Sequence, residues 1–220
     1  MSSVEVRIPA GVETLPGDLT LPASAKGLVL FAHGSGSSRM SARNRGVADA
    51  LAARGLGTLL FDLLTGNEGR IRSFVFDIEL LAERLVRATH WARREPATRG
   101  LPLAYFGAST GAAAALIAAA GDPEIAVVVS RGGRVDLAQR VLSQVDAPTL
   151  LIVGELDHDV LELNRTALAV IPAEKQLAIV PGASHLFEEP GCLEQVAQLA
   201  GAWIERHLVR VEHGDRADVR

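Results

Sequence analysis

Residues 105–114 read YFGASTGAAA, and this stretch decides the fold class. Ser109 stands between Gly107 and Gly111, and this five-residue stretch comes directly after the apolar run LPLAYF and directly before an alanine-rich segment. The apolar run has the length of a buried strand, and the alanines favour a helix, so Ser109 falls where a strand gives way to a helix. In so tight a turn, side chains at the two glycine positions would collide with the neighbouring helix and strand. We therefore expect a strand, a sharp turn and a helix that lies close to a sheet.

The rest of the chain repeats this alternation of strand-length apolar runs and segments with helical periodicity. Strands that are apolar on both faces and alternate with helices indicate a mostly parallel sheet covered on both sides. The sequence therefore predicts an α/β protein of about eight strands that forms one domain over residues 1–220, with a frayed tail at 209–220. The expected strands are 4–8, 18–21, 27–32, 57–61, 103–106, 125–129, 149–153 and 176–180, and the expected helices are 42–53, 74–94, 110–120, 160–171 and 190–207.

Composition excludes several classes of function. The chain has 220 residues, of which 48% are hydrophobic and 22% charged, and its net charge of −4 is spread without a basic stripe that would bind nucleic acid. The N-terminus lacks the pattern of a signal peptide, and the longest apolar stretch, near 112–120, is too short to cross a bilayer. Cys192 is the single cysteine, so an intrachain disulfide is excluded and plain packing is its expected role. We expect a cytoplasmic protein without nucleic-acid or membrane partners, either a monomer or a homodimer.

A G-x-S-x-G sequence at a strand-to-helix joint is typical of a nucleophile elbow. A serine hydroxyl is a weak nucleophile, so it needs a histidine to take its proton and an acid to orient that histidine, and in this kind of fold the chain order is serine, acid, histidine. His185, in the sequence PGASHLF after the last expected strand, is the candidate base. The other histidines precede the serine, lie in the loop expected to carry the acid, or lie in the last helix and tail; they are His33, His90, His158, His207 and His213.

Three carboxylates follow the strand that Gly154 ends, in the sequence VGELDHDV. Asp159 and Glu162 have the spacing of a capping box, which gives Asp159 a structural role at the start of the next helix. Glu155 is so near the strand end that it points away from the site, although the sequence leaves it open. Asp157 is therefore the candidate acid. A metal site at this DHD cluster is disfavoured, because three consecutive residues do not converge on one ion and no second ligand cluster is visible.

The developing negative charge of an acyl-transfer reaction needs fixed N–H donors. Thr110, the first residue after the serine, supplies one backbone N–H, and the loop FAHGSGSS after an earlier strand supplies the other, which we place at Ser35. His33 is then expected to be a buried, hydrogen-bonding residue.

The glycines of this loop also permit a dinucleotide-binding interpretation, with Asp62 as a ribose ligand. However, that fingerprint requires a glycine at position 39, where the chain has Arg39.

In these motifs the chain resembles the α/β-hydrolases, and in particular the small members of the dienelactone hydrolase family. The resemblance runs from HGSGSS through FGASTG and VGELDHDV to GASHLFEEPG. It implies an eight-stranded sheet, a serine or cysteine nucleophile, an aspartate and a histidine in the later loops, and hydrolysis of ester-like bonds without a cofactor or metal. The namesake enzymes use cysteine, and position 109 is serine, so lactone specificity is not carried over. Similar proteins also occur joined to phosphoribosyltransferase domains, for which we expect no room in this chain.

The sequence says less about the substrate. Only about twenty residues separate the strands at 125–129 and 149–153, which leaves no cap domain and suits small or medium acyl groups. Arg131, at a strand's carboxyl end, is positioned either to meet an anionic substrate group or to pair with a neighbouring acid. The loop at 65–74 is expected to border the cleft. We expect a carboxylesterase-like serine hydrolase acting on a small ester-like molecule, with a non-catalytic ligand- or partner-binding protein as the alternative.

Overall fold

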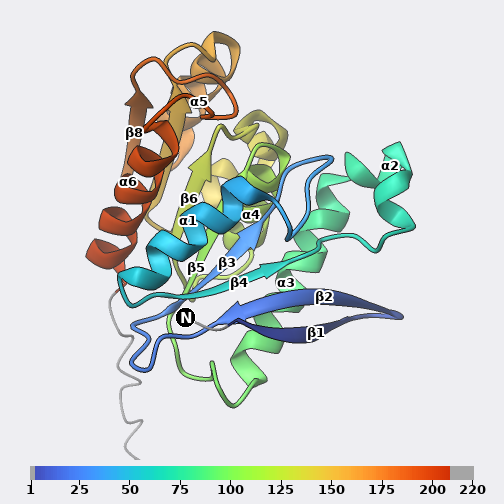
Figure 1. The fold of residues 1–220 in the computed structure, drawn as a ribbon. Helices are drawn as coiled ribbons and strands as arrows, with labels where there is room; N and C mark the ends of the chain where they lie inside the picture. Colours follow the sequence, from blue (N-terminus) through green and yellow to red (C-terminus); the bar gives the residue numbers. More distant parts are fainter. Residues whose placement is uncertain (1–2, 209–220) are drawn as a thin grey trace, which may run out of the picture.

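The computed structural model describes residues 3–208. Eight strands form one sheet in the order β1-β2-β4-β3-β5-β6-β7-β8 (Figure 1). The antiparallel pairings are β1 with β2 and β2 with β4, and all pairings from β4 to β8 are parallel. The strand bounds are β1 Val4–Ala10, β2 Glu13–Thr20, β3 Leu28–Ala32, β4 Gly57–Phe61, β5 Leu103–Ala108, β6 Ile125–Arg131, β7 Thr149–Gly154 and β8 Lys175–Val180.

Helices cover both faces of this sheet, as the sequence predicted (Figure 1). On one face, apolar residues of α1 and α6 pack against the strands together with Phe187. On the other face, the core is formed with α3, α4, the 3₁₀ helix η2 and α5. The helix bounds are α1 Ala42–Ala53, η1 Glu68–Arg70, α2 Arg72–Val75, α3 Ile78–Arg94, α4 Thr110–Ala120, η2 Val135–Gln144, α5 His158–Val170 and α6 Cys192–His207.

Two elements differ from the sequence prediction for identifiable reasons. The second strand begins at Glu13, five residues earlier than expected. The prediction started it later because Pro16 and Gly17 usually disfavour strand interiors. Pro16 is tolerated because β2 pairs with β4 only from Gly17 onward, and Gly17 is accommodated because the Val6 and Phe61 side chains leave little room for a Cβ there. The long helix expected at 74–94 is divided between α2 and α3, because the Asp77 side chain accepts the Leu80 N–H at 3.0 Å and starts a new helix.

The link between β6 and β7 contains only η2, so no cap domain is inserted there. The frayed tail expected at 209–220 lies outside the described residues. Within residues 3–208, no helix combines the length and the apolar character needed to cross a membrane.

Close packing between α4 and β3 brings the serine turn next to the loop that follows β3. A Cβ atom added to Gly111 would lie 2.1 Å from the Ala32 carbonyl oxygen, and one added to Gly107 would lie 2.5 Å from the Ala112 Cα. Both distances are far shorter than any real carbon contact, so only glycine fits at either position. The helix start is thereby held against the carboxyl end of β3.

We predict that Gly111→Ala destabilises the protein by about 3 kcal/mol or more, because the backbone of α4 or β3 must move to admit the methyl group. Urea denaturation followed by circular dichroism measures the change. Gly66→Ala is the matched control, since an added Cβ there meets nothing within 4 Å. Equal midpoints for the two variants would show that the contact is not a packing constraint.

Candidate active site

Ser109 occupies the turn between β5 and α4 in a strained backbone conformation. Its φ of 51° and ψ of −120° lie in a region that non-glycine residues rarely adopt. The turn is fixed by hydrogen bonds on both sides: the Ser109 N–H donates to the Arg131 carbonyl at 3.1 Å, and the Ser109 carbonyl accepts the Arg134 N–H at 3.1 Å. A strand followed by such a turn and a helix is the context that the G-x-S-x-G sequence requires.

Two other loops meet this turn at the carboxyl edge of the sheet. A Cβ atom added to Gly34 would lie 3.0 Å from the Ser109 Cβ, so the loop after β3 passes directly beside the serine. A Cβ added to Gly132 would lie 3.4 Å from both Cε1 and Nδ1 of the His185 ring. The Ser109 N–H is hydrogen-bonded to Arg131, which directly precedes Gly132. The serine and the histidine therefore both lie beside the segment 131–132.

The candidate acid and base are in direct contact. His185 Nδ1 lies 2.6 Å from Asp157 Oδ2, a distance typical of a charge-assisted hydrogen bond. A carboxylate oxygen can only accept, so Nδ1 carries the proton of this hydrogen bond, and in the neutral form of the ring Nε2 is the acceptor. Glu155, the alternative acid, has its Oε2 at 2.8 Å from the Gly182 N–H that donates to it. The structure therefore brings Asp157, rather than Glu155, to the histidine.

The capping box expected at Asp159 and Glu162 does not form. The helix α5 begins at His158, so Asp157 stands at the N-cap position and Asp159 lies in the first turn. No side chain makes an N-cap hydrogen bond there. The carboxylate of Asp157 instead binds His185, while a negative charge in the first turn, at Asp159, suits the helix dipole.

Phe187, which sequence reasoning missed, anchors the histidine loop. It is two residues after His185, is only 1% exposed, and has a φ of 56°, which is rare for a bulky residue. Its ring belongs to the core under α1 and α6, and its N–H donates to the Ser184 carbonyl at 3.2 Å. Burial of the ring thus fixes the turn that presents the imidazole.

The two expected oxyanion donors lie side by side, although one of them already has an acceptor. Thr110 is the first residue of α4, where a backbone N–H has no partner within the helix. The Ser35 N–H donates to the Thr110 hydroxyl at 2.8 Å. Any oxyanion that binds Ser35 must therefore share or replace the hydroxyl of Thr110.

His33 is a buried, hydrogen-bonding residue, as expected. Its Nε2 accepts the Leu63 N–H at 3.0 Å, and its Nδ1 lies 3.0 Å from the Gly34 carbonyl, to which it donates. Burial lowers the pKa of His33, and this outweighs the opposite effects of the Gly34 carbonyl and Asp62. The ring is therefore neutral, and both of its nitrogens are engaged in the structure.

A cavity of about 280 Å³ lies between the loop after β3 and the segment after β4. Its lining includes Ser35, Asp62, Leu64, Arg70, Val75 and Leu81. The loop expected to border the cleft does so through its first residues. Neither Ser109 nor His185 lines this cavity, but Gly34, which lies beside Ser109, does.

Arg131 is nearly buried, at 8% exposure, at the end of β6. Its Nη1 is enclosed without a hydrogen-bond partner, and within residues 3–208 no carboxylate lies at ion-pair distance from it. The alternative that it pairs with a neighbouring acid is therefore wrong for this part of the chain. Burial, together with the charge of Arg43, lowers the pKa of Arg131 to about 10, so it stays a cation at neutral pH.

The dinucleotide interpretation is not supported by the surroundings of Asp62. Its carboxylate accepts the Arg39 N–H at 2.7 Å, so the residue that interrupts the glycine fingerprint is the partner of the expected ribose ligand. Among the described residues, no group of three histidine, cysteine, aspartate or glutamate side chains could hold a metal ion.

The chain is similar to several proteins of known structure. A dienelactone hydrolase from Anabaena variabilis is 54% identical, superposes with a TM-score of 0.92, and matches 94% of this chain and 99% of its own. The chain belongs to the dienelactone hydrolase family. The esterase domain of a Rhodothermus marinus protein, 20% identical with a TM-score of 0.77 over 95% of this chain and its own entire length, shares the fold. Membership in the dienelactone hydrolase family supports a hydrolase function.

A curated protein of Mycobacterium tuberculosis is 61% identical over 206 residues, or 93% of this chain. It bears the name "Putative phosphoribosyl transferase". This family member is longer, and the matched part is 46% of it, so the chain spans about half the length of the curated relatives it matches. No family model matches the chain.

We predict that His33 makes folding stability depend on pH. Its pKa is about 6.5 when unfolded and lower when folded, so the unfolded chain binds more protons as the pH falls below 6.5. As the pH falls, the free energy of unfolding of the wild type should therefore decrease more steeply than that of His33→Asn, by up to about 1.4 kcal/mol per pH unit. The asparagine amide keeps one hydrogen-bond donor and one acceptor but does not titrate. Urea unfolding between pH 5 and 7.5 measures both slopes, and parallel curves would contradict the prediction.

Proposed function

We propose that the protein is a serine hydrolase, carboxylesterase-like, that cleaves small or medium acyl esters through an acyl-enzyme on Ser109. The observation that carries this proposal is the contact of 2.6 Å between His185 Nδ1 and Asp157 at the edge where the strained Ser109 turn lies. That contact leaves Nε2 free to act as a base. The family membership is consistent with such chemistry, because serine and cysteine nucleophiles both form covalent intermediates when an adjacent base activates them.

The proposed reaction has two stages. Ser109 Oγ attacks the carbonyl carbon while His185 Nε2 takes its proton, and the N–H groups of Thr110 and Ser35 stabilise the resulting oxyanion. When the ester C–O bond breaks, His185 returns that proton to the leaving alcohol. Water then attacks the acyl group with His185 again as the base, which releases the acid and restores Ser109. Asp157 holds the imidazole and stabilises its protonated form.

The size of the cavity supports small or medium substrates. Its volume of about 280 Å³ lies just below the usual range for ligand pockets, and its lining includes Ser35, one of the proposed oxyanion donors. Its wall contains Leu64, Val75 and Leu81, which suit an apolar substituent of the substrate.

We assign the transferase name of the longer relatives to the part of them that this chain does not match. The matched part is 46% of the relative, and in this chain it folds as a hydrolase domain. The loop after β3 has no G-K-[ST] sequence of the kind that cradles phosphates.

Arg131 completes the proposed site as a contact for an anionic group of the substrate. A nearly buried guanidinium whose charged neighbour is a second cation, Arg43, lacks the compensation that a buried charge requires. Its main chain binds Ser109, which places it beside the reacting centre. An anionic substituent would supply the missing charge.

We predict that Ser109→Ala lowers kcat for short p-nitrophenyl esters by about 10⁴-fold or more, because no other group can form the acyl-enzyme. A fluorophosphonate probe, located by mass spectrometry, should label Ser109 in the wild type. Ser73→Ala, at an exposed position of α2, is the control and should retain both turnover and labelling. No turnover and no label in any form would favour the non-catalytic binding protein, and a label elsewhere would identify another nucleophile.

For Arg131, we predict a loss that depends on substrate charge. Arg131→Met keeps the apolar stem but removes the cation, so kcat/KM for p-nitrophenyl hemisuccinate should fall by about 10- to 100-fold, the equivalent of one charge-assisted hydrogen bond. For neutral p-nitrophenyl butyrate the change should stay within about threefold. Arg99→Met, at an exposed position, is the control. Equal losses on both esters would exclude an anion contact.

A further inference from the structure

The loop 33–41, HGSGSSRMS, carries the proposed oxyanion donor Ser35 but contains little that could hold it in place. It links β3 to α1, and six of its nine residues are glycine or serine. Such residues bury almost no apolar surface and leave the backbone many accessible conformations. An oxyanion donor must nevertheless be fixed before the reaction, because its contribution depends on not having to reorganise. The Thr110 hydroxyl, which accepts the Ser35 N–H at 2.8 Å, is one anchor outside the loop, and the residues after Ser35 need others.

Asp62 provides one anchor, directly after β4. Its Oδ1 accepts the backbone N–H of Arg39 at 2.7 Å, and its Oδ2 lies 3.5 Å from Nε of the same arginine. One carboxylate thus binds both the main chain and the side chain of a single loop residue. With 20% side-chain exposure for Asp62 and 19% for Arg39, the pair is better shielded from solvent than a typical surface ion pair.

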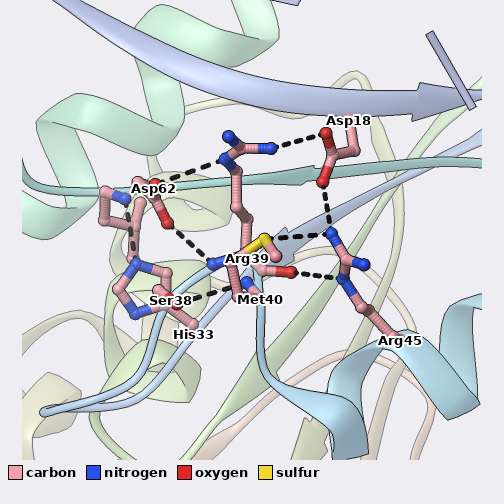
Figure 2. Close-up of polar contacts among 8 residues, drawn as sticks. Asp18, His33, Ser38, Arg39, Met40, Arg45 and Asp62 are labelled. Carbon is pink, nitrogen blue, oxygen red and sulfur yellow. Dashed lines mark hydrogen bonds and ion pairs between the residues drawn. The ribbon is translucent and has the colours of Figure 1, made fainter. Parts of the chain in front are cut away.

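Arg39 is also held from its other side, as Figure 2 shows. Its Nη1 donates to Asp18 Oδ1 at 2.6 Å, and Asp18 Oδ2 accepts from Arg45 Nη2 at 2.9 Å. Arg45 Nε in turn donates to the Arg39 carbonyl at 3.2 Å. The N–H, the carbonyl and the guanidinium of Arg39 are therefore all bound, by residues of β2, of α1 and of the chain after β4.

The start of the loop is tied to the same place. The Leu63 N–H donates to His33 Nε2 at 3.0 Å, so the dipeptide Asp62-Leu63 binds the loop on both sides of Ser35. We propose that Asp62 is a positioning residue that, through Arg39, holds the Ser35 N–H where the oxyanion forms. The strand β4 supplies a rigid base for this contact, because β2 and β3 pair with it on its two sides.

This inference rests on the proposed esterase function, and it assigns Asp62 a role in kcat rather than in binding. Without the carboxylate, the Arg39 N–H loses its acceptor and the loop gains freedom near Ser35. A donor displaced by about 1 Å can cost up to about 10²-fold in rate. Asp62 also lines the cavity, so KM separates the two roles: a residue that only positions the loop should leave KM nearly unchanged. The tetrahedral state, which requires the Ser35 N–H, should be weakened selectively.

The experiment measures kcat and KM for p-nitrophenyl butyrate, together with inhibition by a trifluoromethyl ketone that forms a tetrahedral adduct. Asp62→Ala should lower kcat by about 10-fold or more and weaken the inhibitor by a similar factor, with KM within about threefold. Asp62→Asn keeps an oxygen that can accept the Arg39 N–H, so it should restore most of kcat. Arg39→Met, which loses the guanidinium but keeps the N–H contact, should lie between the two. If Asp62→Ala does not fold, these two variants and the inhibitor carry the test.

Asp122→Ala is the matched control. Asp122 is also an aspartate bound by an arginine, Arg93, at 2.8 Å and has 17% side-chain exposure, but it precedes β6 at the opposite end of that strand from Arg131. Its loss should leave kcat and inhibitor affinity unchanged. Equal effects of Asp62→Ala and Asp122→Ala would overturn the proposal, and so would a rise in KM at constant kcat, which would mark Asp62 as a substrate contact. Failure of the esterase proposal itself would appear differently, as an absence of turnover in the wild type.

Discussion

The contact between Gly111 and the end of β3 is the constraint on which the rest of the site depends. The position a Cβ would take at Gly111 is only 2.1 Å from the Ala32 carbonyl, so the first turn of α4 lies directly on the strand end. That approach forces the strained turn at Ser109 and brings the loop after β3 to within bonding distance of Thr110. One steric requirement thus sets the serine, the helix N-terminus and the second N–H donor in a fixed relation. The α4 alanines extend the requirement along the sheet, because larger side chains would lift the helix away from it.

The second half of the site depends on a different kind of constraint, because the histidine comes from a loop. Its position is set by burial of Phe187 in a backbone conformation that costs free energy and persists only when packing compensates. A Cβ at Gly154 would lie 2.4 Å from the Ala183 carbonyl, so the end of β7 and the loop after β8 also approach closely. The aspartate and histidine loops are therefore held together by backbone contact, and the hydrogen bond between Asp157 and His185 forms within that frame.

The sequence predicted those parts of the molecule whose causes are local. The elbow is readable because glycine, serine and alanine occur within a few residues of one another, and the eight strands are readable from their apolar runs. The prediction was wrong where a tertiary contact outweighs a local preference. For example, β2 contains Pro16 because its pairing with β4 starts only at Gly17. Asp157, not Asp159, stands at the start of α5 while its carboxylate binds His185 instead of capping the helix. Both contacts join residues that are far apart in the chain, so local sequence patterns do not predict them.

Arginines show the same limit most clearly, since their roles depend on what surrounds them in space. Arg39 and Arg131 look equivalent in the sequence, as each follows a predicted strand near a glycine. In the structure, Arg39 lies between Asp18 and Asp62, whereas the described residues offer Arg131 no carboxylate. A compensated cation joins loops and strands, because its charge is satisfied inside the protein. An uncompensated, nearly buried cation is costly unless a bound group supplies the opposite charge, and this is why we propose a substrate contact for Arg131 and a positioning role for the network of Arg39.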